Sequence, residues 1–83
     1  MSYWVEVDIE ILKPGKFSVR RAFSPIVERY GGSLKQNQRN INMYNLSYSD
    51  DGVHVVKDLQ EIVEEAKKYD CVLAIHINSL HLF

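Results

Sequence analysis

Three acidic residues near the start of the chain are the side chains best placed to do chemistry. Glu6, Asp8 and Glu10 alternate with aliphatic residues in the stretch YWVEVDIEI, residues 3–11. Alternate side chains of a strand lie on one face of its sheet, so the three carboxylates should form a row that begins at Trp4. We call these four residues the acidic row. Such a row can dock a basic protein surface, and beside histidines it can bind a metal or catalyse proton transfer.

The elements that must hold this row can be predicted from the periodicity of the apolar residues. Alternation predicts one strand over residues 3–11 and another over residues 71–78. Apolar residues at helical spacing predict a helix that follows Ser18, a typical N-cap, and ends at Tyr30 before two glycines.

Pro25 leaves two interpretations of this helix open. It either kinks a continuous helix, or it lies in the first turn of a shorter helix that is capped by Ser24. In the second case the chain from Phe17 to Phe23 would be an extended partner of the first strand. We favour the continuous helix, because the apolar stripe passes through the proline without a break.

Turn signals divide the middle of the chain. Residues 41–49 have the mixed polarity of a strand at a sheet edge. The sequence DDG at residues 50–52 is the strongest turn signal, and it predicts a hairpin that leads into a short strand over residues 53–56. Asp58 followed by Glu61 resembles a capping box and predicts the start of a second helix.

These elements follow the order β-α-β-β-α-β, which is the ferredoxin-like α+β arrangement. We expect one small domain over residues 1–83, with two helices on one face of a four-stranded antiparallel sheet and the other face open. Its core should consist of the inward apolar residues of the first strand, the last strand and the two helices, which are Val5, Val7, Ile9, Phe23, Ile26, Val27, Leu59, Ile62, Val63, Leu73, Ile75 and Ile77.

Two histidines are predicted to join the acidic row on the open face. The first strand is central in this topology. Because side chains alternate along a strand, one histidine of the strand 53–56 and one of the last strand should lie on the same face as the acidic row. The candidate binding residues are therefore Trp4, Glu6, Asp8, Glu10, His54 and His76.

Neither a metal site nor catalysis is expected from these residues. The histidines and carboxylates come from three strands, and no short His-x-His or Cys-x-x-Cys spacing accompanies them. A His–carboxylate pair needs a pocket that excludes water, and a chain of 83 residues has little room for one. We therefore predict that the protein is not an enzyme and holds no cofactor.

Composition narrows the classes of partner. Ten basic and eleven acidic residues give a net charge of −1, which argues against binding to nucleic acid. RNA-binding domains of this fold stack bases on the central strands, where this chain would repel the phosphates with carboxylates. Cys71 is the only cysteine, so it forms no internal disulfide, and its apolar neighbours predict an inert buried thiol. With neither a basic-then-apolar leader nor an apolar run near ~18 residues, we expect a cytoplasmic protein without a membrane segment.

The end of the chain breaks the alternation of the last strand. Leu80 and Leu82 share the parity of His76, which predicts a bulge or bend after Asn78. Without that bulge, these leucines and Phe83 would form an exposed apolar patch, and a homodimer would be its simplest use.

Together these features predict a non-catalytic protein-interaction module. Its acidic row would bind a basic partner protein with Trp4 as an anchor, and an immunity- or inhibitor-type protein is the specific form. The alternative is a ligand- or metal-responsive regulatory domain that acts through dimerisation. The row also fits a solvated sheet face, on which the acids serve solubility and the histidines are cross-strand partners.

Overall fold

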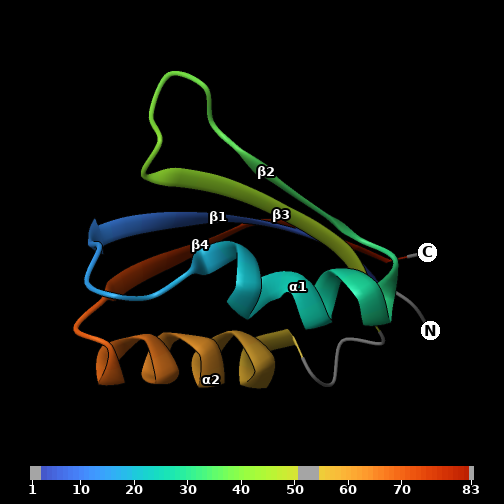
Figure 1. Ribbon diagram of the computed structural model, residues 1–83. Coiled ribbons are helices and arrows are strands. Elements are labelled where there is room, and N and C mark those ends of the chain that lie inside the picture. The colour runs from blue at the N-terminus through green and yellow to red at the C-terminus, as the bar shows by residue number, and fades with distance from the viewer. Residues whose placement is uncertain (1–2, 51–54, 83) are drawn as a thin grey trace.

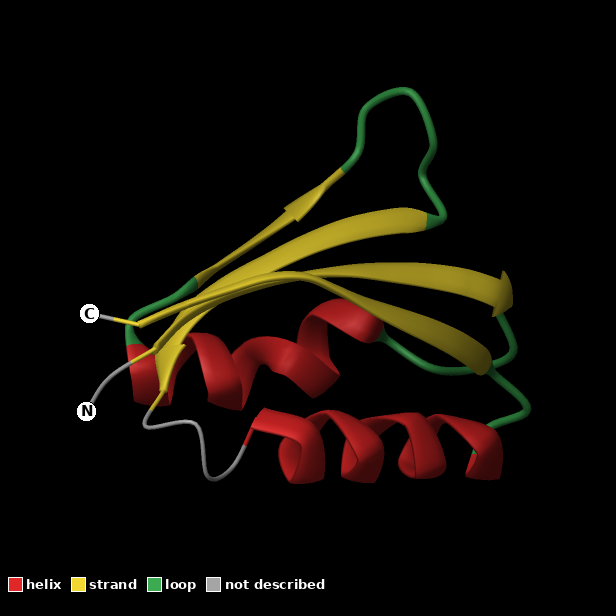
Figure 2. Cartoon of the chain, turned by 180° about the vertical axis from the view of Figure 1, so that it is seen from behind, coloured by secondary structure: helices red, strands yellow, loops and turns green. Residues whose placement is uncertain are grey.

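Six elements form one helix layer and one sheet layer (Figure 1). The computed structural model describes residues 3–50 and 55–82. The elements are β1 Tyr3–Lys13, α1 Val19–Tyr30, β2 Ser33–Gln36, β3 Met43–Asp50, α2 Val55–Lys68 and β4 Val72–Leu82. The sheet is antiparallel with the strand order β2-β3-β1-β4, and both helices lie on one of its faces (Figure 2). This is the ferredoxin-like α+β fold that the sequence predicts.

One face of β1 supplies the centre of the core. Val5, Val7 and Ile9 are completely buried, as the alternation of this strand predicts. They pack in one cluster with side chains from both helices, from β3 and β4 and from the turn before β4, which are Val19, Phe23, Ile26, Leu46, Tyr48, Leu59, Ala66, Cys71 and Leu73. Burial also raises the pKa of the Cys71 thiol, because desolvation disfavours the thiolate. The thiol is therefore part of the packing.

The first helix is continuous, as predicted. The Ser18 hydroxyl accepts a hydrogen bond from the backbone N–H of Arg21 at 3.3 Å, so Ser18 is the N-cap. α1 then continues through Pro25 to Tyr30. The alternative in which the chain from Phe17 to Phe23 is an extended strand is therefore wrong. Gly31 follows the helix with a φ of 64°, the left-handed conformation that commonly ends helices.

The hairpin of the sheet lies earlier in the chain than predicted. β2 and β3 are joined by residues 37–42, and this loop protrudes from the rest of the sheet (Figure 1). The backbone N–H groups of Arg39 and Asn40 donate hydrogen bonds to the side-chain oxygen of Asn37 at 2.8 and 3.1 Å. Such local bonds favour a turn over an extended strand, so asparagine chemistry makes the hairpin.

The predicted strand over residues 53–56 is wrong at Val55 and Val56, and residues 53 and 54 lie outside the described residues. Val55 and Val56 are the first residues of α2, although valine favours strands. The place beside β1 is taken by β3, whose Leu46 and Tyr48 are completely buried in the core. Tertiary packing of β3 therefore outweighs the local preference of the valines.

The second helix begins before its predicted cap. Asp58 lies in the first turn of α2, and its carboxylate accepts a hydrogen bond from the Tyr30 hydroxyl of α1 at 3.3 Å. Asp58 thus joins the two helices and does not cap α2. In the part of the chain that the structure describes, no helix is long and apolar enough to cross a membrane.

The last strand contains the predicted bulge. Ile77 lies opposite Val7, whereas Ser79 lies opposite Glu6, so Asn78 is an extra residue in β4. The predicted side of Ile77 is correct, but its predicted burial is wrong. Its register is that of the helix-covered side, yet the side chain is 49% exposed because β4 is at the edge of the sheet.

Candidate protein-binding site

The acidic row lies along the middle of the open face of the sheet. Glu6, Asp8 and Glu10 are on β1, which pairs with β3 on one side and β4 on the other. They point away from the buried Val7 and its neighbours, and Figure 2 shows helices on the other face only. All three carboxylates are half-buried, as is Trp4 at the start of the row.

The neighbouring strands surround the row with uncharged residues. From Trp4 to Glu10, the residues opposite the row on β3 are Ser49, Ser47, Asn45 and Met43. On β4, His76 lies opposite Asp8 and Ala74 lies opposite Glu10. Hydroxyl, amide and apolar groups do not neutralise carboxylates, so the partners on β3 leave the charge of the row unbalanced. Further out on the same face, β2 carries the cation Lys35 opposite Asn45.

Asp8 is the best-defined carboxylate of the row. The side-chain amide of Asn45 donates a hydrogen bond to Asp8 Oδ1 at 3.1 Å and lies 3.5 Å from the carbonyl oxygen of Val7. On the other side the register places His76 opposite Asp8. The amide donor holds the orientation of the carboxylate and leaves its charge unchanged.

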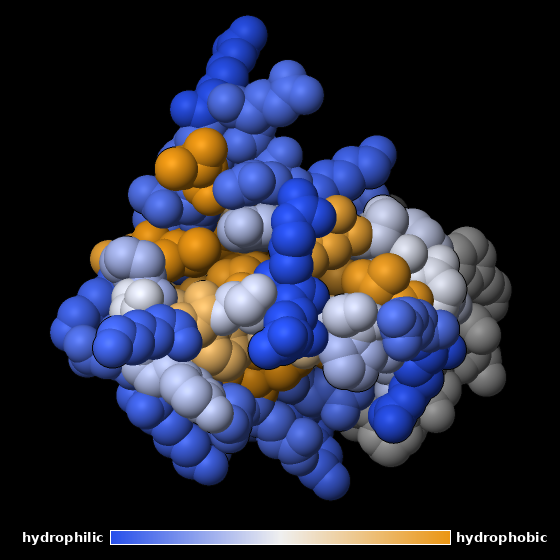
Figure 3. Space-filling view, in the orientation of Figure 1, coloured by the Kyte–Doolittle hydropathy of each residue, from blue (hydrophilic) through white to orange (hydrophobic). Residues whose placement is uncertain are grey.

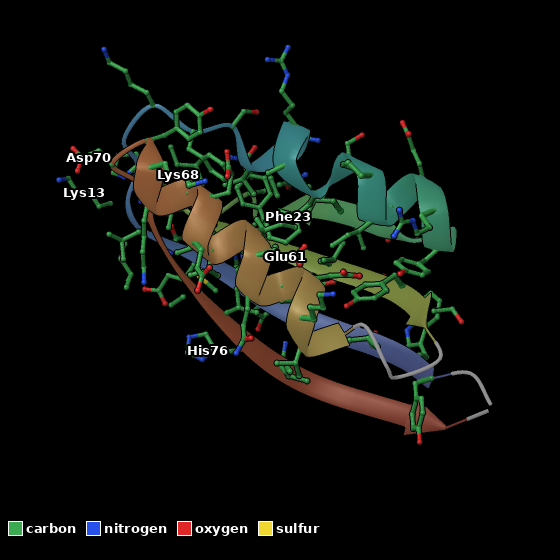
Figure 4. The ribbon with its side chains drawn as sticks, turned by 90° about the horizontal axis from the view of Figure 1, so that it is seen from below. Lys13, Phe23, Glu61, Lys68, Asp70 and His76 are labelled. Atoms are coloured by element: carbon green, nitrogen blue, oxygen red, sulfur yellow. The ribbon has the colours of Figure 1, made fainter. Side chains whose placement is uncertain are left out.

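The ion pairs that the described residues form lie away from the row. Lys13 Nζ is 2.8 Å from Asp70 Oδ1 at one end of the sheet (Figure 4), and Lys68 Nζ is 3.3 Å from Glu65 Oε2 on α2. Within residues 3–50 and 55–82, no carboxylate of the row belongs to an ion pair. Three carboxylates about 7 Å apart along one strand therefore give the open face a negative potential.

The structure brings together five of the six residues that the sequence nominates. His76 is exposed on β4 beside the row, and Figure 4 shows it far from the pair of Lys13 and Asp70. Trp4 and the three carboxylates lie on the same face as His76. His54 lies outside the described residues, and Val55 and Val56, which the same predicted strand included, are the first residues of α2.

Sequence reasoning missed the β3 residues beside the row. It placed the neighbouring strand too late in the chain, although Tyr44, Leu46 and Tyr48 alternate with polar residues and carry the signal of a strand with one buried face. It also missed Lys35 of β2, which lies opposite Asn45. Lys35 lines a depression of about 200 Å³ that reaches Asp8.

The site has the form of a surface more than of a pocket. The depression beside Asp8 is smaller than the ~300 Å³ at which small-molecule pockets begin. Among the residues that the structure describes, no three His, Cys, Asp or Glu side chains are close enough to hold a metal ion. Beyond the row, hydrophilic side chains cover most of the protruding hairpin at the top of Figure 3.

No protein-family model, curated protein or solved structure matches this chain. The class that the structure defines is thus a ferredoxin-like α+β domain with an acidic open face. This fold carries many unrelated functions, so the function has to be argued from the site.

Proposed function

We propose that this chain is a non-catalytic protein-interaction domain that docks a basic partner protein on the acidic row. An immunity- or inhibitor-type protein is the specific form that we favour, because such a protein needs a complementary surface and no catalytic group. The observation that carries the proposal is the position of three carboxylates on a central strand, on the uncovered face, without an ion-pair partner in the described residues.

The strand itself suits this role. β1 is paired on both sides over most of its length, so the backbone of the row is already ordered before a partner arrives. Binding then costs little backbone entropy. Negative charge on a rigid surface speeds the encounter with a positive one, and the half-buried Trp4 provides an aromatic anchor at the end of the row.

Charge-matched variants test the proposal. One variant neutralises the row with Glu6→Gln, Asp8→Asn and Glu10→Gln. A control variant removes the same amount of charge from exposed acids of the two helices with Glu28→Gln, Glu61→Gln and Glu65→Gln. Each protein is immobilised, proteins retained from the source cells are identified by mass spectrometry, and the association rate of the purified partner is measured at low and physiological salt.

The partner should be basic and should be retained by the parent and by the control. Neutralising the row should slow association by about tenfold or more at low salt and flatten its salt dependence, because electrostatic steering acts on the encounter. The control should change the rate by less than about threefold, since its charges face away from the docking surface. Equal effects of the two variants, or an acidic partner, would refute the proposal.

A further inference from the structure

The two edges of the sheet differ in length and in charge. The β2 edge has four residues and carries Lys35, and a short charged edge resists pairing with another strand. The β4 edge has eleven residues, and its sequence VLAIHINSLHL contains no Asp, Glu, Lys or Arg. Figure 4 shows β4 as the outermost strand, and within residues 3–50 and 55–82 no strand pairs with its outer side.

A groove of about 450 Å³ with both apolar and charged residues in its lining runs beside this edge, between β4 and α2. Val56 of α2 and Ile77 of β4 are 55% and 49% exposed in it, although both side chains are apolar. Leu59, Val63 and Ile75 continue the apolar lining. The helix layer is thus too narrow to cover the sheet at β4, and the edge and the groove form one uncovered surface.

We propose that a second copy of this chain binds along the β4 edge. A two-fold axis perpendicular to the sheet makes the two β4 strands pair antiparallel, so that one sheet continues through both copies. Each copy then covers the Ile77 side of the other. This surface is separate from the acidic row and does not depend on the function proposed for it.

The composition of the β4 edge favours a second copy of the chain over a basic partner. A strand without Asp, Glu, Lys or Arg can meet itself across a two-fold axis without repulsion between such charges, and it has no carboxylate to attract a positive surface. At the rim of the groove, Glu64 and Lys67 have opposite charges. The two-fold axis sets the two α2 helices antiparallel, so the acid of one copy can face the base of the other.

The difference between the two edges also limits the assembly to two copies. After the β4 strands pair, both outer edges of the continuous sheet are β2 strands, which are short and carry Lys35. Growth therefore stops at two copies, as expected for a self-complementary interface.

Matched lysine substitutions test this proposal by sedimentation velocity over a range of concentrations. The parent chain should sediment as a dimer at high concentration and dissociate on dilution. Ile77→Lys should weaken the dimer by at least about tenfold, because the two-fold axis brings the new charge toward its own copy. Ile41→Lys is the control, since Ile41 is 68% exposed on the hairpin loop, and it should change the dimer constant by less than about threefold.

A mixing experiment distinguishes a second copy from any other occupant. Ile77→Lys and Ile77→Glu should each be monomeric alone and should form a heterodimer when mixed. Hydrogen exchange of the parent needs no variant, and the β4 amides should exchange more slowly as concentration rises while the β2 amides do not change. A parent chain that stays monomeric at about 1 mM, or a dimer whose β4 amides are not protected, would overturn the proposal. The same holds if Ile41→Lys dissociates the dimer as strongly as Ile77→Lys.

Discussion

The two faces of β1 carry opposite kinds of side chain on one backbone. On the covered face Val5, Val7 and Ile9 are completely buried, and on the open face Glu6 and Asp8 are half-buried and charged. Because the side chains of a strand alternate, one short stretch serves both faces. Substitutions on the covered face should therefore change the free energy of unfolding, and substitutions on the open face should change partner binding.

The largest effect is expected on the covered face. Ile9→Ala should lower the free energy of unfolding by ~2–5 kcal/mol, because it removes a completely buried side chain and leaves a cavity. Chemical denaturation followed by circular dichroism measures this loss. A loss below about 1 kcal/mol would mean that the covered face does not stabilise the fold as its burial suggests.

The next effect belongs to the open face. Trp4→Ala should weaken binding of the partner by about 2 kcal/mol, mostly through faster dissociation, if Trp4 is an interface anchor. Surface plasmon resonance gives both rates. Leu12→Ala is the control, because Leu12 is an exposed apolar residue at the other end of β1. Equal losses in the two variants would contradict the role of Trp4 as an anchor.

A smaller effect is expected at the helix that covers the core. Ser18→Ala should lower the free energy of unfolding by about 1 kcal/mol, because the backbone N–H of Arg21 loses the hydroxyl that caps it. Ser18→Thr keeps a capping hydroxyl and should restore most of the loss. If thermal or chemical denaturation shows no difference between the alanine and threonine variants, the cap does not stabilise α1.

The smallest effect on stability is expected in the acidic row. Asp8→Asn should change the free energy of unfolding by no more than about 0.5 kcal/mol, because its oxygen still accepts from Asn45. The same variant should slow association with the partner. The Ile9 variant is measured in parallel. A loss above about 1 kcal/mol for Asp8→Asn would contradict the prediction that the open face contributes little to stability.

Much of the fold was predictable because it depends on local periodicity. The alternation of β1, the cap at Ser18 and the bulge at Asn78 are all readable from neighbouring residues, and the structure contains each of them. The element order was also predicted correctly, although two of its elements were assigned to the wrong residues.

The errors arose where two segments compete for one place in the sheet. The DDG turn signal and the valines after it are a stronger local signal for a hairpin than the polar stretch that forms β2 and its loop. That stretch nevertheless contains Leu34, which lies opposite Leu46 and packs against the core. Its asparagines supply the turn. Local signals do not show which of two possible strands the sheet will contain, so sequence reasoning assigned the strand beside the row to the wrong residues.

The sequence alone is enough to assign the buried residues of β1 and the acidic row, because alternation is a property of a single strand. The hydrogen bond from Asn45 of β3 to Asp8 and the exposure of Ile77 at the β4 edge depend on the tertiary structure. These features depend on the pairing of strands that are distant in the sequence. The free energy of such pairing comes from packing and burial across the whole sheet, and no single segment of the chain encodes it.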